Sequence, residues 1–475
     1  MGYVMVKYCS NFSYIKTYKY SCIASILYIS ALASGSVSAA EAQEESHAER
    51  QTSYIELPLQ RGGLSGNGAV PWFTDALSIG ESKMHVALDN GSHFNWATSD
   101  RCTTPACNAH RKVNTRTGDI AWIDESPMDI SWGPWGTMAV GVGKGTYNLA
   151  DSNGSYLSYD QNLTLSLNYS GPKFEYLPWG GGITLPADSR CVWAVPANPL
   201  CPTFDGTVKK SKDSRRSSGL SSSFLLYDLY FNTDKLQSPQ YSFFTDRPTR
   251  SGSFYMGGDN YKVFDQSTAV NLPPRLTPFG YLWGTKLHEM KVGSNSLGAF
   301  ESATIVLDTG SSRFKGDAAH IIPILNQLLS IRDGNGMPVF ERIFEGTPQK
   351  WTGLKYRKGG PKDHPNLPPI SIEIGQSCNG VDGQHLILTL APDQYSYLIE
   401  AGDQKGTWAV SAHVLDGIPF LLVGSTVLDL VYSRYSYNVL QTKDKPELIQ
   451  GDMTVFRKAT GEQPAGYQCV KPGSA

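Results

Sequence analysis

Two short turns in the sequence each place a carboxylate, a glycine and a serine directly after an apolar run. They are Asp89-Asn90-Gly91-Ser92 and Asp308-Thr309-Gly310-Ser311, which follow the apolar runs at 86–88 and 305–307. Glycine allows a tight backbone turn and a close approach of the backbone to a ligand. The two aspartates are 219 positions apart, about the length of one lobe. This spacing predicts a duplicated architecture with one Asp from each half.

Such a pair of carboxyl groups suits hydrolysis by an activated water. Two carboxylates that face each other at about 3 Å cannot both ionise, so they share a proton. One then acts as general base on a water, while the protonated one polarises the substrate carbonyl and later donates its proton. A single Asp-x-Gly-Ser turn is common, because Asp and Asn hydrogen-bond their own backbone. The pairing of two such turns, each behind an apolar run, is what favours a catalytic site.

Length and composition indicate the fold that must position these turns. A chain of 475 residues exceeds the usual size of a single core, so two domains or lobes are expected. The 47 Gly, 28 Pro and 25 Tyr, together with many short Thr, Val, Phe and Tyr runs, favour a β-rich fold with many turns. The net charge of −2 gives no electrostatic reason to expect nucleic acid or an anionic membrane as a partner.

The N-terminal region is typical of an export signal. Three lysines, Lys7, Lys16 and Lys19, precede an apolar run at 22–33, and small residues follow at 34–40. The run is too short to cross a bilayer, so we expect a cleaved signal peptide rather than an anchor. We therefore predict that the protein is exported, to the periplasm or the extracellular space.

Cysteine usage agrees with export. Six cysteines lie beyond the predicted signal, and an even number in an exported chain suggests disulfides. Six cysteines permit 15 connectivities, and proximity in sequence suggests the pairs Cys102–Cys107, Cys191–Cys201 and Cys378–Cys469. No group of Cys and His has zinc-ligand spacing, so neither a metal nor another cofactor is predicted.

The chain organisation follows from changes in composition. A basic, small-residue stretch at 208–223 is interpreted as a solvated loop, with a processing site at Arg215-Arg216 as the alternative. The spacing of apolar residues predicts a helix over 317–331, which Pro323 would start or kink. The predicted segments are a signal peptide (1–40), a leader or short pro-segment (41–69), an N-terminal lobe (70–270), a C-terminal lobe (271–460) and a tail (461–475).

Several segments along residues 70–445 resemble the pepsin-like aspartic proteases, peptidase family A1. They include "HVALDNGSHFNWA" with Trp96 seven residues after Asp89, "ATIVLDTGSSRF", "DISWGPWGTMAVGVG", "SGSFYMGGDN" and "GIPFLLVGSTVLDLVY". The resemblance implies an all-β fold with minor helices, in which the active-site cleft lies between two related β lobes. It also implies that Asp89 and Asp308 are catalytic. The element under the second turn corresponds to Leu422-Val423-Gly424, and our candidate for the first lobe is 176–186.

The resemblance assigns further roles around the two aspartates. Gly91 and Gly310 would contact substrate through their backbones, and Ser92 and Ser311 would hydrogen-bond the outer carboxylate oxygens. Trp132 would replace the family's flap tyrosine and cover the substrate, with Trp135 as the alternative.

Asn90 is the main departure from the family pattern. The family has Thr or Ser there, and two hydroxyls, one per lobe, hydrogen-bond across the interface beneath the dyad. Thr309 keeps its hydroxyl. An amide still accepts and donates hydrogen bonds, so we expect an asymmetric network and not necessarily an inactive site.

These features favour an exported, monomeric aspartic endopeptidase that acts on an extended polypeptide, bound through main-chain contacts and apolar subsites. The alternative is a pepsin-fold protein that binds or inhibits without cleaving, which Asn90 and Trp132 favour. A glycosidase is a third class, and its carboxylates would lie about 5–10 Å apart. No nucleic-acid partner and no stable membrane insertion are expected.

Overall fold

The computed structural model describes residues 54–472, except 63–71, 119, 132–135, 153, 155, 170–173, 175–176, 193–223, 234, 301–302, 346–348 and 401–403. Contacts within the chain divide it into Met1–Arg50 and Gln51–Ala475, and all described residues belong to the second unit. The predicted signal peptide, Arg215-Arg216, Trp132 and Trp135 lie outside the described residues.

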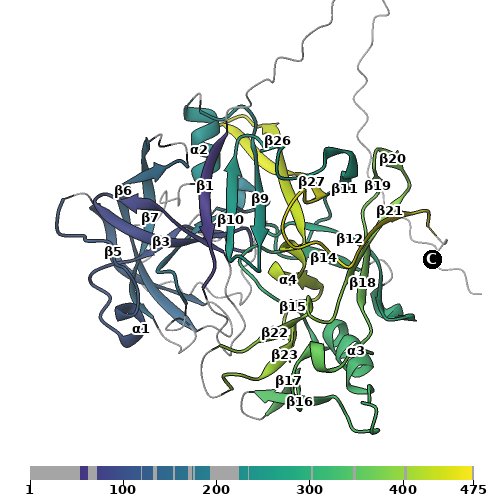
Figure 1. Cartoon of the computed structure of the whole chain (residues 1–475). Helices are drawn as coiled ribbons and strands as arrows, with labels where there is room; N and C mark the ends of the chain where they lie inside the picture. Colours follow the sequence, from purple (N-terminus) through teal and green to yellow (C-terminus); the bar gives the residue numbers. More distant parts are fainter. Residues whose placement is uncertain are drawn as a thin grey trace, which may run out of the picture. The chain divides into compact units, whose positions relative to one another are not determined.

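A large sheet contains fifteen of the described strands (Figure 1). In spatial order they are β20 (Val381–Asp382), β19 (Ser377–Cys378), β11 (Val270–Leu272), β27 (Pro446–Arg457), β26 (Val431–Gln441), β9 (Gln240–Asp246), β10 (Ser251–Met256), β1 (Ile55–Gln60), β2 (Phe73–Ile79), β3 (Ser82–Asp89), β8 (Gly181–Thr184), β4 (Trp96–Thr98), β7 (Tyr156–Tyr169), β6 (Thr137–Ala150) and β5 (Ile120–Ser131).

Two smaller sheets are built from the second half of the described chain. The second sheet has the order β24 (Ala412–Val414), β15 (Phe314–Gly316), β25 (Leu421–Val423), β14 (Thr304–Leu307), β12 (Gly284–Val292), β18 (Ile370–Ile374), β21 (His385–Leu390) and β28 (Gly466–Val470), with β13 (Asn295–Ser296) on β12. The third consists of β16 (Phe340–Glu345), β17 (Lys350–Tyr356), β23 (Trp408–Val410) and β22 (Ser396–Leu398).

The described α-helices are short and few: α1 (Pro105–Asn108), α2 (Leu225–Asn232), α3 (Ala318–Leu329) and α4 (Ser425–Leu428). The mostly β fold with minor helices is therefore confirmed. None of these helices is long and apolar enough to cross a membrane.

The predicted helix over 317–331 is present as α3. It begins after Asp317, whose carboxylate accepts the backbone N–H of His320, as an N-cap residue does. Pro323 lies inside the helix rather than at its start, so of the two expected effects, a start or a kink, the structure excludes a start at this residue. Helix α2 was not predicted, because its aromatic-rich sequence LLYDLYFN resembles a strand as much as a helix.

Each half of the described chain contains the same parallel strand pair at its aspartate turn. Strand β3 pairs in parallel with β8, so that Asp89 lies opposite Thr184. Strand β14 pairs in parallel with β25, so that Leu307 lies opposite Val423. A third strand pairs antiparallel with each partner, β4 with β8 and β15 with β25. The candidate segment 176–186 thus contains the first-half counterpart of β25.

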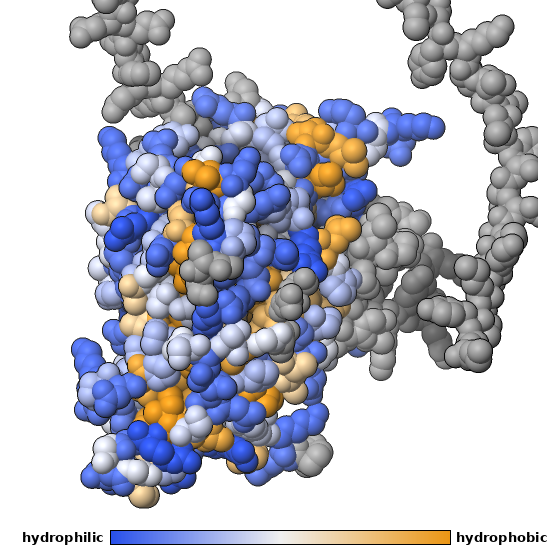
Figure 2. Space-filling view, turned by 90° about the vertical axis from the view of Figure 1, so that its right-hand side faces the viewer, coloured by the Kyte–Doolittle hydropathy of each residue, from blue (hydrophilic) through white to orange (hydrophobic). Residues whose placement is uncertain are grey.

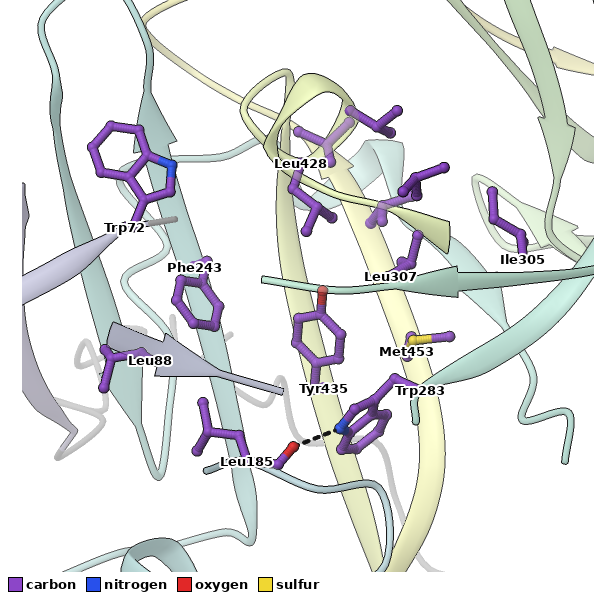
Figure 3. Packing of buried hydrophobic residues seen from close by; sticks show 14 of the residues in the cluster. Trp72, Leu88, Leu185, Phe243, Trp283, Ile305, Leu307, Leu428, Tyr435 and Met453 are labelled. Atoms are coloured by element: carbon purple, nitrogen blue, oxygen red, sulfur yellow. Dashed lines mark hydrogen bonds between the residues drawn. The ribbon is translucent and has the colours of Figure 1, made fainter. Parts of the chain in front are cut away.

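The two halves are joined through a continuous ladder and a buried aromatic cluster. Strand β9 of the first half pairs antiparallel with β26 of the second. The buried rings of Tyr241, Trp283 and Tyr435 pack there, with the Tyr241 and Tyr435 ring centroids 4.8 Å apart. The indole N–H of Trp283 donates to the Leu185 carbonyl at 2.9 Å (Figure 3).

Strand β1 comes from the segment interpreted as a leader. It pairs with β10 along its whole length, from Ile55 opposite Met256 to Gln60 opposite Ser251. Leu57 is fully buried. Residues 55–60 are therefore an integral strand of the large sheet.

Two of the three predicted disulfides are confirmed, Cys102–Cys107 and Cys378–Cys469. Cys191 is also disulfide-bonded, but Cys201 lies outside the described residues. On the face shown in Figure 2, the surface is mostly hydrophilic, and its hydrophobic residues form several separate clusters.

A buried ion pair fixes the chain after β1 against α4. Arg61 pairs with Asp429, and both side chains are almost fully buried. The same carboxylate accepts the indole N–H of Trp72 at 2.8 Å and the hydroxyl of Thr245 at 3.0 Å. A buried carboxylate is stable only when it is paired and hydrogen-bonded, and Asp429 meets both conditions.

Replacing Asp429 by Ala should lower the free energy of unfolding by about 3–5 kcal/mol, because it leaves a buried guanidinium without its partner. Urea denaturation measures this loss. The control is Glu400→Ala, which breaks the more exposed pair with Arg250 and should cost less than about 1 kcal/mol. Equal losses in the two variants would contradict this account.

Candidate active site

The two aspartate turns face each other with an approximate two-fold symmetry. The Gly91 N–H donates to the Asp89 carboxylate at 2.7 Å, and the Gly310 N–H donates to the Asp308 carboxylate at 2.8 Å. A Cβ on Gly91 would collide with the Asp308 carboxylate, and a Cβ on Gly310 would collide with that of Asp89. Only glycine therefore lets each turn approach the carboxyl group of the other, and the structure brings the two carboxyls together.

Asn90 and Thr309 hold the turns together by reciprocal hydrogen bonds. The Thr309 N–H donates to the Asn90 side-chain oxygen at 2.7 Å, and the Asn90 N–H donates to the Thr309 hydroxyl at 3.1 Å. The Thr309 hydroxyl in turn donates to the Leu88 carbonyl at 2.8 Å. Both residues are buried. The Asn90 amide oxygen thus accepts the Thr309 N–H, as the hydroxyl of a Thr or Ser at position 90 would.

The asymmetry expected from Asn90 arises at its side-chain nitrogen, Nδ2. Among the described residues, the Asn90 Nδ2 has no hydrogen-bond partner, and neither does the Tyr435 hydroxyl. The amide lies close enough to the hydroxyls of Tyr241 and Tyr435 to lower the pKa of each, against a larger increase caused by burial. Compared with a Thr or Ser at this position, Asn90 therefore keeps an oxygen that accepts the Thr309 N–H. It adds a buried N–H donor, Nδ2, beside Tyr241 and Tyr435.

Burial raises the pKa of both carboxyls, and the negative charge of Asp89 raises that of Asp308 further. For Asp308, burial is the largest cause, followed by the negative charge of Asp89, and the pKa rises to about 7. For Asp89, burial raises the pKa, while hydrogen bonds from Gly91 and Ser92 oppose the increase. A hydrogen bond joins the two carboxyls. Asp308 therefore holds the shared proton more readily, and Asp89 is the more readily ionised member.

The remaining predicted residues lie in different environments. Besides its hydrogen bond to the carboxylate, Ser92 directs its hydroxyl to the Asp89 carbonyl at 3.4 Å. The Ser311 hydroxyl is buried and has no hydrogen-bond partner in the described part of the chain. No group of three metal-ligating side chains occurs among the described residues.

Three residues near the dyad were not predicted. Thr184 donates its hydroxyl to the Ser92 carbonyl at 2.6 Å, and its N–H donates to the Asn95 side-chain oxygen at 2.8 Å. These bonds fix the first turn against β8. Lys315 lowers the pKa of both carboxyls by its positive charge, against the larger effect of burial. In β15 the partly exposed Lys315 lies between two buried residues, Phe314 and Gly316. This alternation is the sequence signal that could have identified it.

Comparisons with known proteins find distant similarity to proteins of the pepsin type. Pepsin A of Callithrix jacchus is 23% identical over 252 residues, which is 53% of this chain and 56% of that protein. Embryonic pepsinogen of Gallus gallus is 24% identical over 236 residues, which is 50% of this chain and 52% of its own length. The chain thus spans about half the length of the curated relatives it matches. No family model matches the sequence.

Replacing Asn90 by Ala should lower the free energy of unfolding by about 1–3 kcal/mol, because the buried Thr309 N–H loses its acceptor. Chemical denaturation measures the loss. The matched variant Asn90→Thr supplies a hydroxyl oxygen and removes the unpartnered amide, so it should cost less than the Ala variant. A Thr variant as unstable as Ala would contradict the proposed role of the Asn90 oxygen.

The dyad should make stability fall as the pH rises from about 4 to 7. The folded protein binds a proton at Asp308 up to about pH 7, whereas the unfolded chain releases it near the ordinary value of 3.8. This stabilisation is complete below pH 4 and lost above 7. In Asp308→Asn the fall measured by urea denaturation should be smaller than in wild type.

The control for this titration is Asp416→Asn, which changes an exposed carboxylate paired with Lys350 and should leave the fall unchanged. Identical slopes in wild type and Asp308→Asn would contradict the assignment.

Proposed function

We propose that this chain, a distant member of the pepsin-like aspartic protease family, is an aspartic endopeptidase. The observation that carries the proposal is the opposed pair Asp89 and Asp308, one from each of two matching turns, buried together with raised pKa values. The homology to pepsin A and embryonic pepsinogen supports the same reaction class.

In the proposed reaction the two carboxyls have different roles. The ionised form of Asp89 is favoured by the N–H of Gly91 and the hydroxyl of Ser92, so Asp89 is suited to take a proton from the attacking water. Asp308 is next to that negative charge and holds the shared proton. It would donate this proton to the carbonyl oxygen of the scissile bond. After attack, Asp89 would pass its proton to the leaving amine nitrogen as the C–N bond breaks, and Asp308 would take a proton back from one hydroxyl of the tetrahedral intermediate.

The proposed substrate is an extended polypeptide that lies across the two turns. Main-chain hydrogen bonds would hold it in the manner of an added strand, with Gly91 and Gly310 contributing backbone contacts and Trp132 a cover. Two disulfides are consistent with an exported protein, and we propose export on this basis together with the N-terminal sequence.

A pepsin-fold protein that binds without cleaving is the second candidate. The unpartnered Asn90 amide favours it, because a buried unsatisfied donor beneath a dyad costs stability. Two apposed carboxyls of raised pKa argue against it, since a binding module gains nothing from their repulsion. The hydrogen bond between the carboxyls also argues against a glycosidase, whose carboxylates are separated by about 5 Å or more.

The test is digestion of denatured casein between pH 3 and 7, with and without pepstatin. Wild type should cleave casein, pepstatin should block cleavage, and Asp308→Ala should lose at least about a thousandfold in rate. The control Asp416→Ala, far from both turns in sequence and exposed, should retain activity. Folded wild type that is inert across this range would reject the endopeptidase and leave the binding protein.

A further inference from the structure

The first aspartate turn contains an asparagine followed directly by a glycine, Asn90-Gly91, and the two residues can react with each other. Glycine has no side chain to hinder the approach of its backbone nitrogen, so the Gly91 nitrogen can attack the side-chain carbon Cγ of Asn90. A new C–N bond forms as the Cγ–Nδ2 bond breaks. Nδ2 takes up the proton released by the Gly91 nitrogen and leaves as ammonia. Water then opens the cyclic imide at either of its carbonyls, which gives aspartate or isoaspartate.

The folded structure restrains both reacting groups. The Gly91 N–H donates to the Asp89 carboxylate at 2.7 Å. The Asn90 side-chain oxygen accepts the Thr309 N–H at 2.7 Å, so the amide is held against the opposite turn. Only 1% of Asn90 is exposed, which also keeps out the water that the second step consumes. The reaction therefore requires that the two aspartate turns separate first.

Two further Asn-Gly pairs in the described part of the chain provide a comparison. Asn335-Gly336 and Asn379-Gly380 lie in surface turns, and both asparagines are exposed. Burial does not protect these two pairs from water as it protects Asn90. The three pairs share the same chemistry, so a difference in their rates reports the protection that the fold gives to Asn90.

We propose that Asn90-Gly91 is a self-modification site, which converts to aspartate or isoaspartate when the turns at Asp89 and Asp308 separate, and that isoaspartate at position 90 prevents the turns from closing again. Isoaspartate lengthens the main chain before Gly91 by a methylene group. Gly91 has no room for this displacement, because even a Cβ there would collide with the Asp308 carboxylate. Aspartate would instead place a third carboxyl beside the dyad, where like charges disfavour ionisation.

The modification gives the opened protein a limited lifetime. When opening and closing are fast, the rate of such a reaction is the rate in the open chain multiplied by the open fraction. The hydrogen bonds between Asn90 and Thr309 would thus protect the chemical identity of the turn as well as its position. This consequence does not depend on the reaction that the dyad carries out.

The test compares the full-length chain in native buffer and in urea above its unfolding midpoint, both near pH 8, where the attack of the Gly91 nitrogen is promoted by base. Peptide mapping by mass spectrometry follows the conversion of each Asn-Gly pair. In native buffer, Asn90 should convert at least about a hundredfold more slowly than Asn379, whereas in urea the two rates should be similar. After dilution from urea, the fraction that regains native tryptophan fluorescence should fall in step with isoaspartate at position 90.

The matched control is the double variant Asn335→Thr with Asn379→Thr, which removes the two exposed pairs and should lose refolding as wild type does. In Asn90→Thr, refolding after the same time in urea should stay complete. Conversion of Asn90 in native buffer at the rate of Asn379 would overturn its protection by the fold. Survival of Asn90 in urea, or an equal loss of refolding in Asn90→Thr, would overturn the modification site.

Discussion

The reciprocal hydrogen bonds between Asn90 and Thr309 are the constraint on which the site depends. Each residue offers a side-chain oxygen to the backbone N–H of the other, so neither turn is held in place by its own half alone. The carboxyls of Asp89 and Asp308 lie together where these hydrogen bonds lock the two turns. Burial raises the pKa of both carboxyls, and the nearby charge of Asp89 raises that of Asp308 further.

The surrounding strands position both turns so that Asn90 and Thr309 can meet. In each half a parallel partner strand, β8 or β25, supports the strand that ends at the aspartate. The β9–β26 ladder and the packing of Tyr241, Trp283 and Tyr435 then join the halves directly behind the turns. The two tyrosine rings stack there beside the Asn90 amide, so the departure from the family pattern lies where the halves meet.

Much of this arrangement could be predicted from the sequence, because the turns have a strong local signature. Apolar runs before Asp89 and Asp308, with glycine two residues later, indicated a strand that ends at each turn, and cysteine proximity predicted two disulfides correctly. Contacts between residues that are far apart in the sequence could not be predicted in this way. Nothing local in the sequence predicts that Asp429 pairs with Arg61, 368 positions away. Lys315 was overlooked because its face depends on the register with β24 and β25.

The position of β1 limits how the N-terminus of the protein can mature. Residues 55–60 supply a complete set of ladder hydrogen bonds to β10 and bury Leu57 and Leu59 in the core. A protease that trims the chain up to Tyr54 leaves the sheet intact, whereas one that cuts further removes a strand and exposes the edge of β10. Trimming from the N-terminus that keeps this sheet intact therefore has to stop before Ile55.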